Sequence, residues 1–105
     1  MIWVVNKYAG VPAGGDHEYI GRPSVLGNPF KIGTDGDRTQ VVENFRVYLE
    51  EALKNPRHPV TQRLRELALI AQNGDLVLVC FCAPKSCHGD VLKEVIERMI
   101  GLQDG

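Results

Sequence analysis

The chain has 105 residues, of which 44% are hydrophobic and 24% charged, and its formal net charge at pH 7 is -1. This length suits one ordinary domain with one hydrophobic core, so we expect a single domain over residues 1–105. A charge so close to zero gives no global field that would steer DNA or RNA onto the surface, although it leaves a local basic groove open.

Hydropathy and cysteine usage indicate a soluble, cytoplasmic protein with no membrane partner. No stretch reaches the roughly 18 apolar residues that a membrane helix needs, and no basic region precedes the short N-terminal apolar run. The three cysteines are an odd number and fall close together, unlike the disulfide framework of a small secreted domain. Such spacing in a reducing compartment suggests a metal site, a reactive thiol or simple burial.

The first third of the chain predicts one strand followed by a long irregular region. Residues 2–5 are a short, mostly β-branched apolar run, typical of a strand that is buried on both faces and central in its sheet. Most of the glycines and three prolines then fall within residues 8–36, which allows only brief strands, around residues 18–20 and 30–32. A connection this long is uncommon in a compact domain unless it is disordered or binds something. Its large apolar residues favour a binding loop.

The remaining elements follow from apolar periodicity and from capping and stop signals. They are a helix from residue 37 or 39 to 53, a helix over 59–73, an apolar strand over 76–82, and a helix from residue 86 or 87 to 100 that stops at Gly101. This order indicates an α/β domain with a small, mostly parallel sheet of two to four strands, about three flanking helices and a right-handed, Rossmann-like crossover. Because two strands alone are marginal, the irregular region supplies more strands or a second copy covers the edge as a homodimer.

Two motifs carry a resemblance to a known family. VVNKY with YIGRPSVLGNPF, followed by LVCFCAPKSCHGDVL, resembles family 4326 of the domains of unknown function, which are small proteins of bacteria and their phages. The resemblance covers residues 4–96 and implies a compact α/β fold. It implies no activity, so function has to be argued from the residues.

The second motif gathers sulfur and imidazole at the junction of a strand and a helix. Cys80 and Cys82 would point to the same face of the strand, and a short turn would bring Cys87 and His88 back towards them. Three thiolates and an imidazole suit tetrahedral zinc, although the spacing differs from the Cys-x-x-Cys knuckles of zinc fingers. One hypothesis is therefore a zinc-stabilised interaction or nucleic-acid-accessory module without catalysis.

A catalytic thiol is the other functional interpretation of this motif. Cys87 lies where the positive end of a helix favours the thiolate, His88 could exchange a proton, and Asp90 could set the histidine tautomer or act as a base. A cysteine phosphatase is excluded, because no arginine follows either Cys82 or Cys87 at the required spacing. Simple burial of the cysteines as small hydrophobes is the third alternative.

The first motif is rich in groups that bind anions and polar rings. Arg22 offers a planar fork for phosphate or carboxylate, and Ser24 and Asn28 offer short polar side chains. Gly27 and the prolines are most simply explained by turns, and no known phosphate-loop pattern is present.

We therefore expect a crevice beyond the carboxyl ends of the strands, where Asn6 and Lys7 end the first strand. Our leading hypothesis is binding of a nucleotide or similar phosphorylated small molecule, held by Arg22 and the start of the last helix. Whether the protein is an enzyme stays open; transfer or hydrolysis at a sugar or acyl carbon is the class to test first. The expected crevice residues are Asn6, Lys7, Arg22, Ser24, Asn28, Cys82, Cys87, His88 and Asp90.

Overall fold

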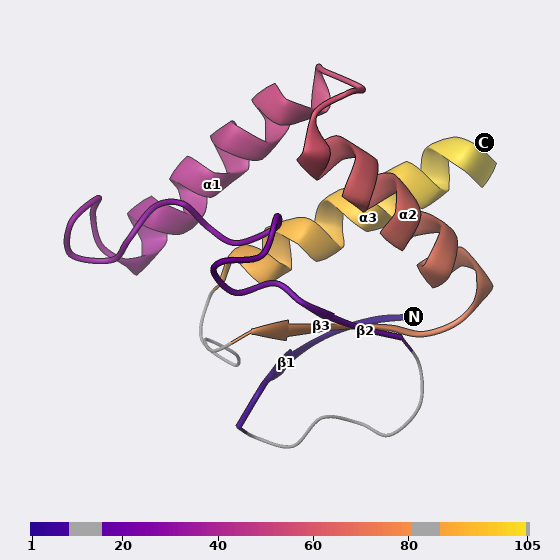
Figure 1. The fold of residues 1–105 in the computed structure, drawn as a ribbon, viewed down its shortest axis with the longest axis horizontal. Coiled ribbons are helices and arrows are strands. Elements are labelled where there is room, and N and C mark those ends of the chain that lie inside the picture. The colour runs from indigo at the N-terminus through magenta and orange to yellow at the C-terminus, as the bar shows by residue number, and fades with distance from the viewer. Residues whose placement is uncertain (9–15, 81–86, 105) are drawn as a thin grey trace.

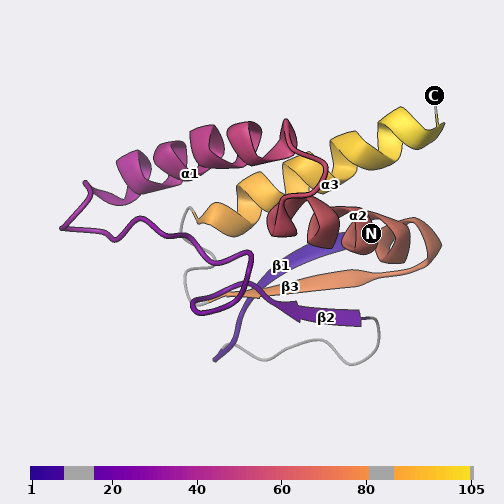
Figure 2. The ribbon, with the colours of Figure 1, turned by 45° about the horizontal axis from the view of Figure 1, so that its top comes forward.

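The computed structural model describes residues 1–8, 16–80 and 87–104. Within these ranges the chain forms the elements β1 (Ile2–Asn6), β2 (Asp16–Tyr19), α1 (Arg38–Leu53), α2 (Pro59–Asn73), β3 (Leu76–Cys80) and α3 (His88–Asp104). The strands form one parallel sheet in the order β1-β3-β2. All three helices of the described chain lie over the same face of this sheet (Figures 1 and 2). The predicted small α/β fold with a parallel sheet is confirmed.

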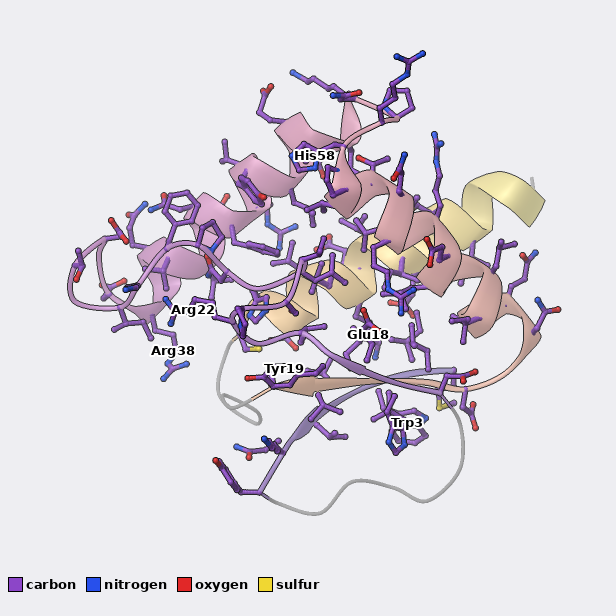
Figure 3. The ribbon with its side chains drawn as sticks, in the orientation of Figure 1. Trp3, Glu18, Tyr19, Arg22, Arg38 and His58 are labelled. Carbon is purple, nitrogen blue, oxygen red and sulfur yellow. The ribbon has the colours of Figure 1, made fainter. Side chains whose placement is uncertain are left out.

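The central strand is β3, and the expectation that residues 2–5 form the central strand is wrong. Every residue of β3 is buried, and β3 pairs with β1 on one side and with β2 on the other. Trp3 of β1 is 45% exposed and points away from the helices (Figure 3). The apolar run of β1 resembles a doubly covered strand, but the helices cover only one face of this small sheet.

Two other boundaries differ from the expected ones. Residues 30–32 form no strand, because Asn28 and Asp35 side chains accept hydrogen bonds from the amides of Phe30 and Lys31 and hold this stretch in turns. Helix α3 continues through Gly101 to Asp104. A glycine inside a helix costs only about 1 kcal/mol relative to alanine, which packing of the apolar face of α3 offsets.

The cap of α1 and the start of α2 agree with the sequence signals, whereas His58 was not among the expected caps. The Asp37 carboxylate accepts a hydrogen bond from the Gln40 amide at 2.9 Å, and His58 Nδ1 accepts one from the Val60 amide at 3.1 Å. Pro59 occupies the first turn of α2, which ends at Gly74. Among the described residues, no helix is long and apolar enough to cross a membrane.

One hydrophobic core lies between the helices and the sheet. Its largest fully buried side chains come from the loop after β2, all three helices and β3: Phe45, Ile20, Leu26, Leu49, Leu64, Leu67, Leu76, Leu78, Leu92 and Ile96. Because the strands are parallel, their carboxyl ends meet at one edge, where the Lys7 amide donates to the Cys80 carbonyl and the Ile20 amide to the Val79 carbonyl. The loop after β2 and the start of α3 both lie at this edge.

Candidate functional site

The loop that follows β2 is folded by consecutive tight turns. The Ser24 amide donates to the Gly21 carbonyl at 2.9 Å, and the Gly27 amide donates to the Ser24 carbonyl at 3.0 Å. The Arg22–Pro23 peptide bond between them is cis. A Cβ at position 27 would lie 3.1 Å from both Arg22 Cα and the Ser24 carbonyl oxygen, a tight approach that favours a glycine in this turn. These turns present the Arg22 side chain to solvent.

Asn28 fastens this loop to α1. Its Oδ1 accepts a hydrogen bond from the Phe30 amide at 2.9 Å, and its Nδ2 donates to the Val41 carbonyl at 3.2 Å. Both ends of the amide are therefore used to hold the loop. The structure thus gives Asn28 a positioning role at the wall of the site.

The start of α3 is closed by a reciprocal pair of hydrogen bonds between Cys87 and Asp90. The Cys87 amide donates to Asp90 Oδ2 at 3.2 Å, and the Asp90 amide donates to the Cys87 carbonyl at 3.0 Å. The amide of Gly89, two residues after Cys87, donates a hydrogen bond to Cys87 Sγ at 3.1 Å. Asp90 therefore caps the helix, and the Cys87 sulfur accepts a hydrogen bond from an amide of the first turn.

His88 is buried between the loop, α1 and α3. Its Nε2 lies 2.7 Å from the Ile20 carbonyl oxygen, its Nδ1 lies 3.9 Å from Cys87 Sγ, and its ring meets Phe45 edge-on with centroids 5.1 Å apart. A carbonyl oxygen can only accept, so Nε2 carries a proton. Neutral His88 therefore turns the lone pair of Nδ1 towards the sulfur.

Burial lowers the pKa of His88 below its ordinary value of 6.5. The hydrogen bond to Ile20 opposes this shift, and the positive charge of Arg22 adds to it. The neutral imidazole is thus the stable form near pH 7.

A cavity of about 480 Å³ lies between the loop, the first turns of α1 and the start of α3. Its described lining consists of Gly21, Arg22, Asn28, Phe30, Lys31, Ile32, Arg38, Val41, Val42, Cys80, Cys87 and His88. Arg22, from the loop, and Arg38, from the start of α1, both line this cavity (Figure 3). The lining includes three basic side chains and, within the part of the chain that the structure describes, no carboxylate. The buried Cys80, Cys87 and His88 form its inner end.

A sequence model of the family described as a domain of unknown function, DUF4326, matches residues 5–98. The chain belongs to this family. The DUF4326 match includes all of both motifs except Val4, and it includes every described residue that lines the cavity. Comparisons with curated proteins and with solved structures found no significant match.

The structure brings four of the expected crevice residues to the cavity: Arg22, Asn28, Cys87 and His88. Among described residues, the other expected members lie outside its lining. Asn6 accepts a hydrogen bond from the Tyr8 amide, and the Lys7 ammonium lies over the Tyr19 ring at 5.6 Å. Within the described part of the chain, Ser24 Oγ is buried with no hydrogen-bond partner, and Asp90 caps α3. Cys82 lies outside the described residues.

The sequence interpretation missed two basic residues, Lys31 and Arg38. Lys31 directly continues the first motif, so extending that motif by one residue would have included it. Arg38 opens α1 beside its cap, and no local pattern says that this helix begins near the start of α3. Val41 and Val42, from the first turns of α1, also line the cavity and were not among the expected crevice residues.

The zinc hypothesis stays a prediction. Within residues 1–8, 16–80 and 87–104, no group of three or more His, Cys, Asp or Glu side chains is arranged to hold a metal ion. The hypothesis needs Cys82, which lies outside these ranges.

Proposed function

We propose that the cavity binds a nucleotide or another phosphorylated small molecule. The observation that carries this proposal is the group of three basic side chains, Arg22, Lys31 and Arg38, around one cavity whose described lining has no carboxylate. Arginine forks and a lysine ammonium are the side chains that best bind phosphate oxygens. A volume of about 480 Å³ falls within the range of small-molecule pockets.

The arrangement of polar and apolar groups supports an orientation for the ligand. Arg22 and Lys31 are exposed, so the phosphate would lie at the mouth of the cavity. The apolar wall contains Phe30, Ile32, Val41 and Val42, which suits a base, a sugar face or a short carbon chain. The non-phosphate part of the ligand would therefore extend towards Cys87 and His88.

A thermal-unfolding screen with paired compounds tests the ligand class. The pairs are nucleoside monophosphates with their nucleosides, and sugar phosphates with the free sugars. A ligand that binds only the folded protein at a hundred times its Kd stabilises it by about 2.7 kcal/mol. We expect at least one phosphorylated compound to raise the unfolding midpoint when its unphosphorylated partner does not. A screen with no shift from any phosphorylated compound would contradict the proposal.

Single substitutions test whether the basic residues are responsible. We expect Arg22→Gln and Arg38→Gln each to weaken binding of the best compound about tenfold or more, because each removes a charge-assisted contact worth roughly 1.5–3 kcal/mol. Arg65→Gln is the matched control, since Arg65 is an exposed arginine on α2 outside the cavity lining. Equal affinities for all of these variants would contradict the assignment of the site.

The zinc-stabilised module remains the alternative and is separated by metal analysis of the purified protein. Stoichiometric zinc whose removal by a chelator unfolds the protein would favour that module over a ligand-binding cavity. The cytoplasmic location expected from the cysteine pattern is part of the present proposal.

A further inference from the structure

We propose that Cys87 and His88 are a nucleophile and its base, and that the protein cleaves an acyl bond in the phosphorylated molecule held by Arg22, Lys31 and Arg38. This inference rests on the proposed function, because the same cavity has to hold the substrate. It assigns a reaction to a site for which the family match gives none.

The geometry of His88 suits a base directed at Cys87. The Ile20 carbonyl keeps the proton on Nε2, and the edge contact with Phe45 fixes the ring, so Nδ1 faces Cys87 Sγ at 3.9 Å. Such contacts are commonly long in unliganded enzymes and shorten in the substrate complex. The Gly89 amide, 3.1 Å from Sγ, stabilises the thiolate that forms when the proton leaves.

The step balances with water as the only co-reactant. The Cys87 thiol proton moves to Nδ1 of His88, and the thiolate forms a bond to the acyl carbon. The bond from this carbon to the leaving group breaks, and the leaving group takes the proton from Nδ1. Water then loses a proton to Nδ1 and attacks the thioester, which releases a carboxylic acid and returns the proton to the Cys87 sulfur.

The lining of the cavity favours an acyl carbon over the two other common electrophiles. Glycosyl transfer ordinarily uses a pair of carboxylates, and the described lining contains none. Phosphoryl transfer to cysteine uses an arginine a few residues further along the chain, and position 93, at that spacing from Cys87, is a lysine. A thiol and an imidazole alone are sufficient for acyl transfer.

Alkylation of the full-length protein tests the nucleophile and the base. Trypsin separates Cys87, in residues 86–93, from Cys80 and Cys82, in residues 66–85, so mass spectrometry can follow each peptide. We expect Cys87 to react faster than the other two cysteines and faster than after unfolding. Iodoacetate is negatively charged and iodoacetamide is neutral, so the basic cavity should favour the first reagent. We expect the ratio of the iodoacetate rate to the iodoacetamide rate to be about tenfold higher for Cys87 than for glutathione. Inorganic phosphate should protect Cys87.

His88→Gln is the test variant, because its side-chain amide can still donate to the Ile20 carbonyl but offers no base. We expect alkylation of Cys87 to slow about tenfold or more in this variant while it remains folded. An unchanged rate in the folded variant overturns the proposal. If the variant does not fold, the test rests on the wild-type protein, through its iodoacetate-to-iodoacetamide rate ratio and its protection by phosphate. A Cys87 that reacts like glutathione then overturns the proposal.

Acetyl phosphate, the simplest compound with a phosphate and an acyl carbon, tests the reaction class. We expect the protein to accelerate its hydrolysis, with an acetyl group transiently bound to Cys87 as a thioester, and Cys87→Ser to abolish both effects. If acetyl phosphate is hydrolysed no faster with the protein than in buffer alone, the proposal that the site cleaves acyl bonds is overturned. Phosphorylated compounds that bind while Cys87 stays unreactive would overturn only this inference, whereas a reactive Cys87 without phosphate protection and without any binding would overturn the proposed function.

Discussion

His88 joins the loop after β2 to the last helix through the hydrogen bond from its Nε2 to the Ile20 carbonyl. The chemistry of the site depends on this contact, because it determines which nitrogen faces Cys87. Burial is the main influence that lowers the pKa of His88, and Arg22 adds to it, whereas this hydrogen bond, the Leu26 backbone and Asp90 raise the pKa. A protonated His88 would have no lone pair for the thiol.

The lowered pKa of His88 makes the free energy of unfolding depend on pH. Between the folded pKa and the ordinary value of 6.5, the unfolded chain binds more protons than the folded protein. The contribution of His88 to the free energy of unfolding is therefore most favourable above pH 6.5 and is lost as the pH falls to the folded pKa. The total loss is about 1.4 kcal/mol for each pH unit between the unfolded and folded pKa values. Urea unfolding at a series of pH values should show a steeper loss for wild type than for His88→Gln. Parallel curves would contradict the burial of a neutral His88.

Gly89 allows α3 to approach the sheet closely. A Cβ there would lie 2.9 Å from both Val4 Cγ1 and Ile20 Cδ1, and the fully buried Ile20 cannot move away. We expect Gly89→Ala to lower the free energy of unfolding by roughly 1–3 kcal/mol. Gly101→Ala is the control on the same helix, because a Cβ there meets no atom of the described residues within 4 Å, and we expect it to stabilise by about 0.5–1 kcal/mol. Denaturant unfolding measures both, and a neutral Gly89→Ala would contradict the close packing.

At the scale of elements, an ion pair with α2 holds the polar edge strand β2 in position. Arg63 donates from Nε and Nη2 to the two carboxylate oxygens of Glu18, at 2.8 and 2.6 Å. In Figure 3, Glu18 points from the sheet towards the helix layer. This pair is the route by which β2, and so the loop that follows it, is aligned with the helices.

A double-mutant cycle measures this tie. For Arg63→Gln and Glu18→Gln we expect a coupling free energy of about 1 kcal/mol, because Glu18 is only 19% exposed, although the 35% exposure of Arg63 limits the gain through solvent screening. The control pair is Arg98 with Glu50, which are 51% and 47% exposed and should couple by less than about 0.5 kcal/mol. Equal couplings would show that Arg63 is not specifically positioning β2.

At the scale of the whole molecule, periodicity and capping were enough to predict the helices, the parallel sheet and the edge where the site lies. They could not rank the strands, because β1 and β3 are both short apolar runs and only pairing decides which is central. The two motifs led us to expect Arg22, Asn28, Cys87 and His88 in one crevice. They did not show the hydrogen bonds by which Asn28 holds the loop and Asp90 caps α3. Arg38 was missed because its place in the cavity wall comes from helix packing.

The central claim is that a phosphorylated ligand binds between the loop after β2 and the start of α3. An NMR titration of labelled protein with the phosphorylated compound that stabilises it most tests this claim directly. We expect the backbone amides of Gly21, Arg22 and Lys31 and the His88 ring to shift together and saturably, while amides around the shallow hollow near Met1 and Ile100 stay still. Shifts that cluster at that hollow, or no shifts with any phosphorylated compound, would contradict the claim.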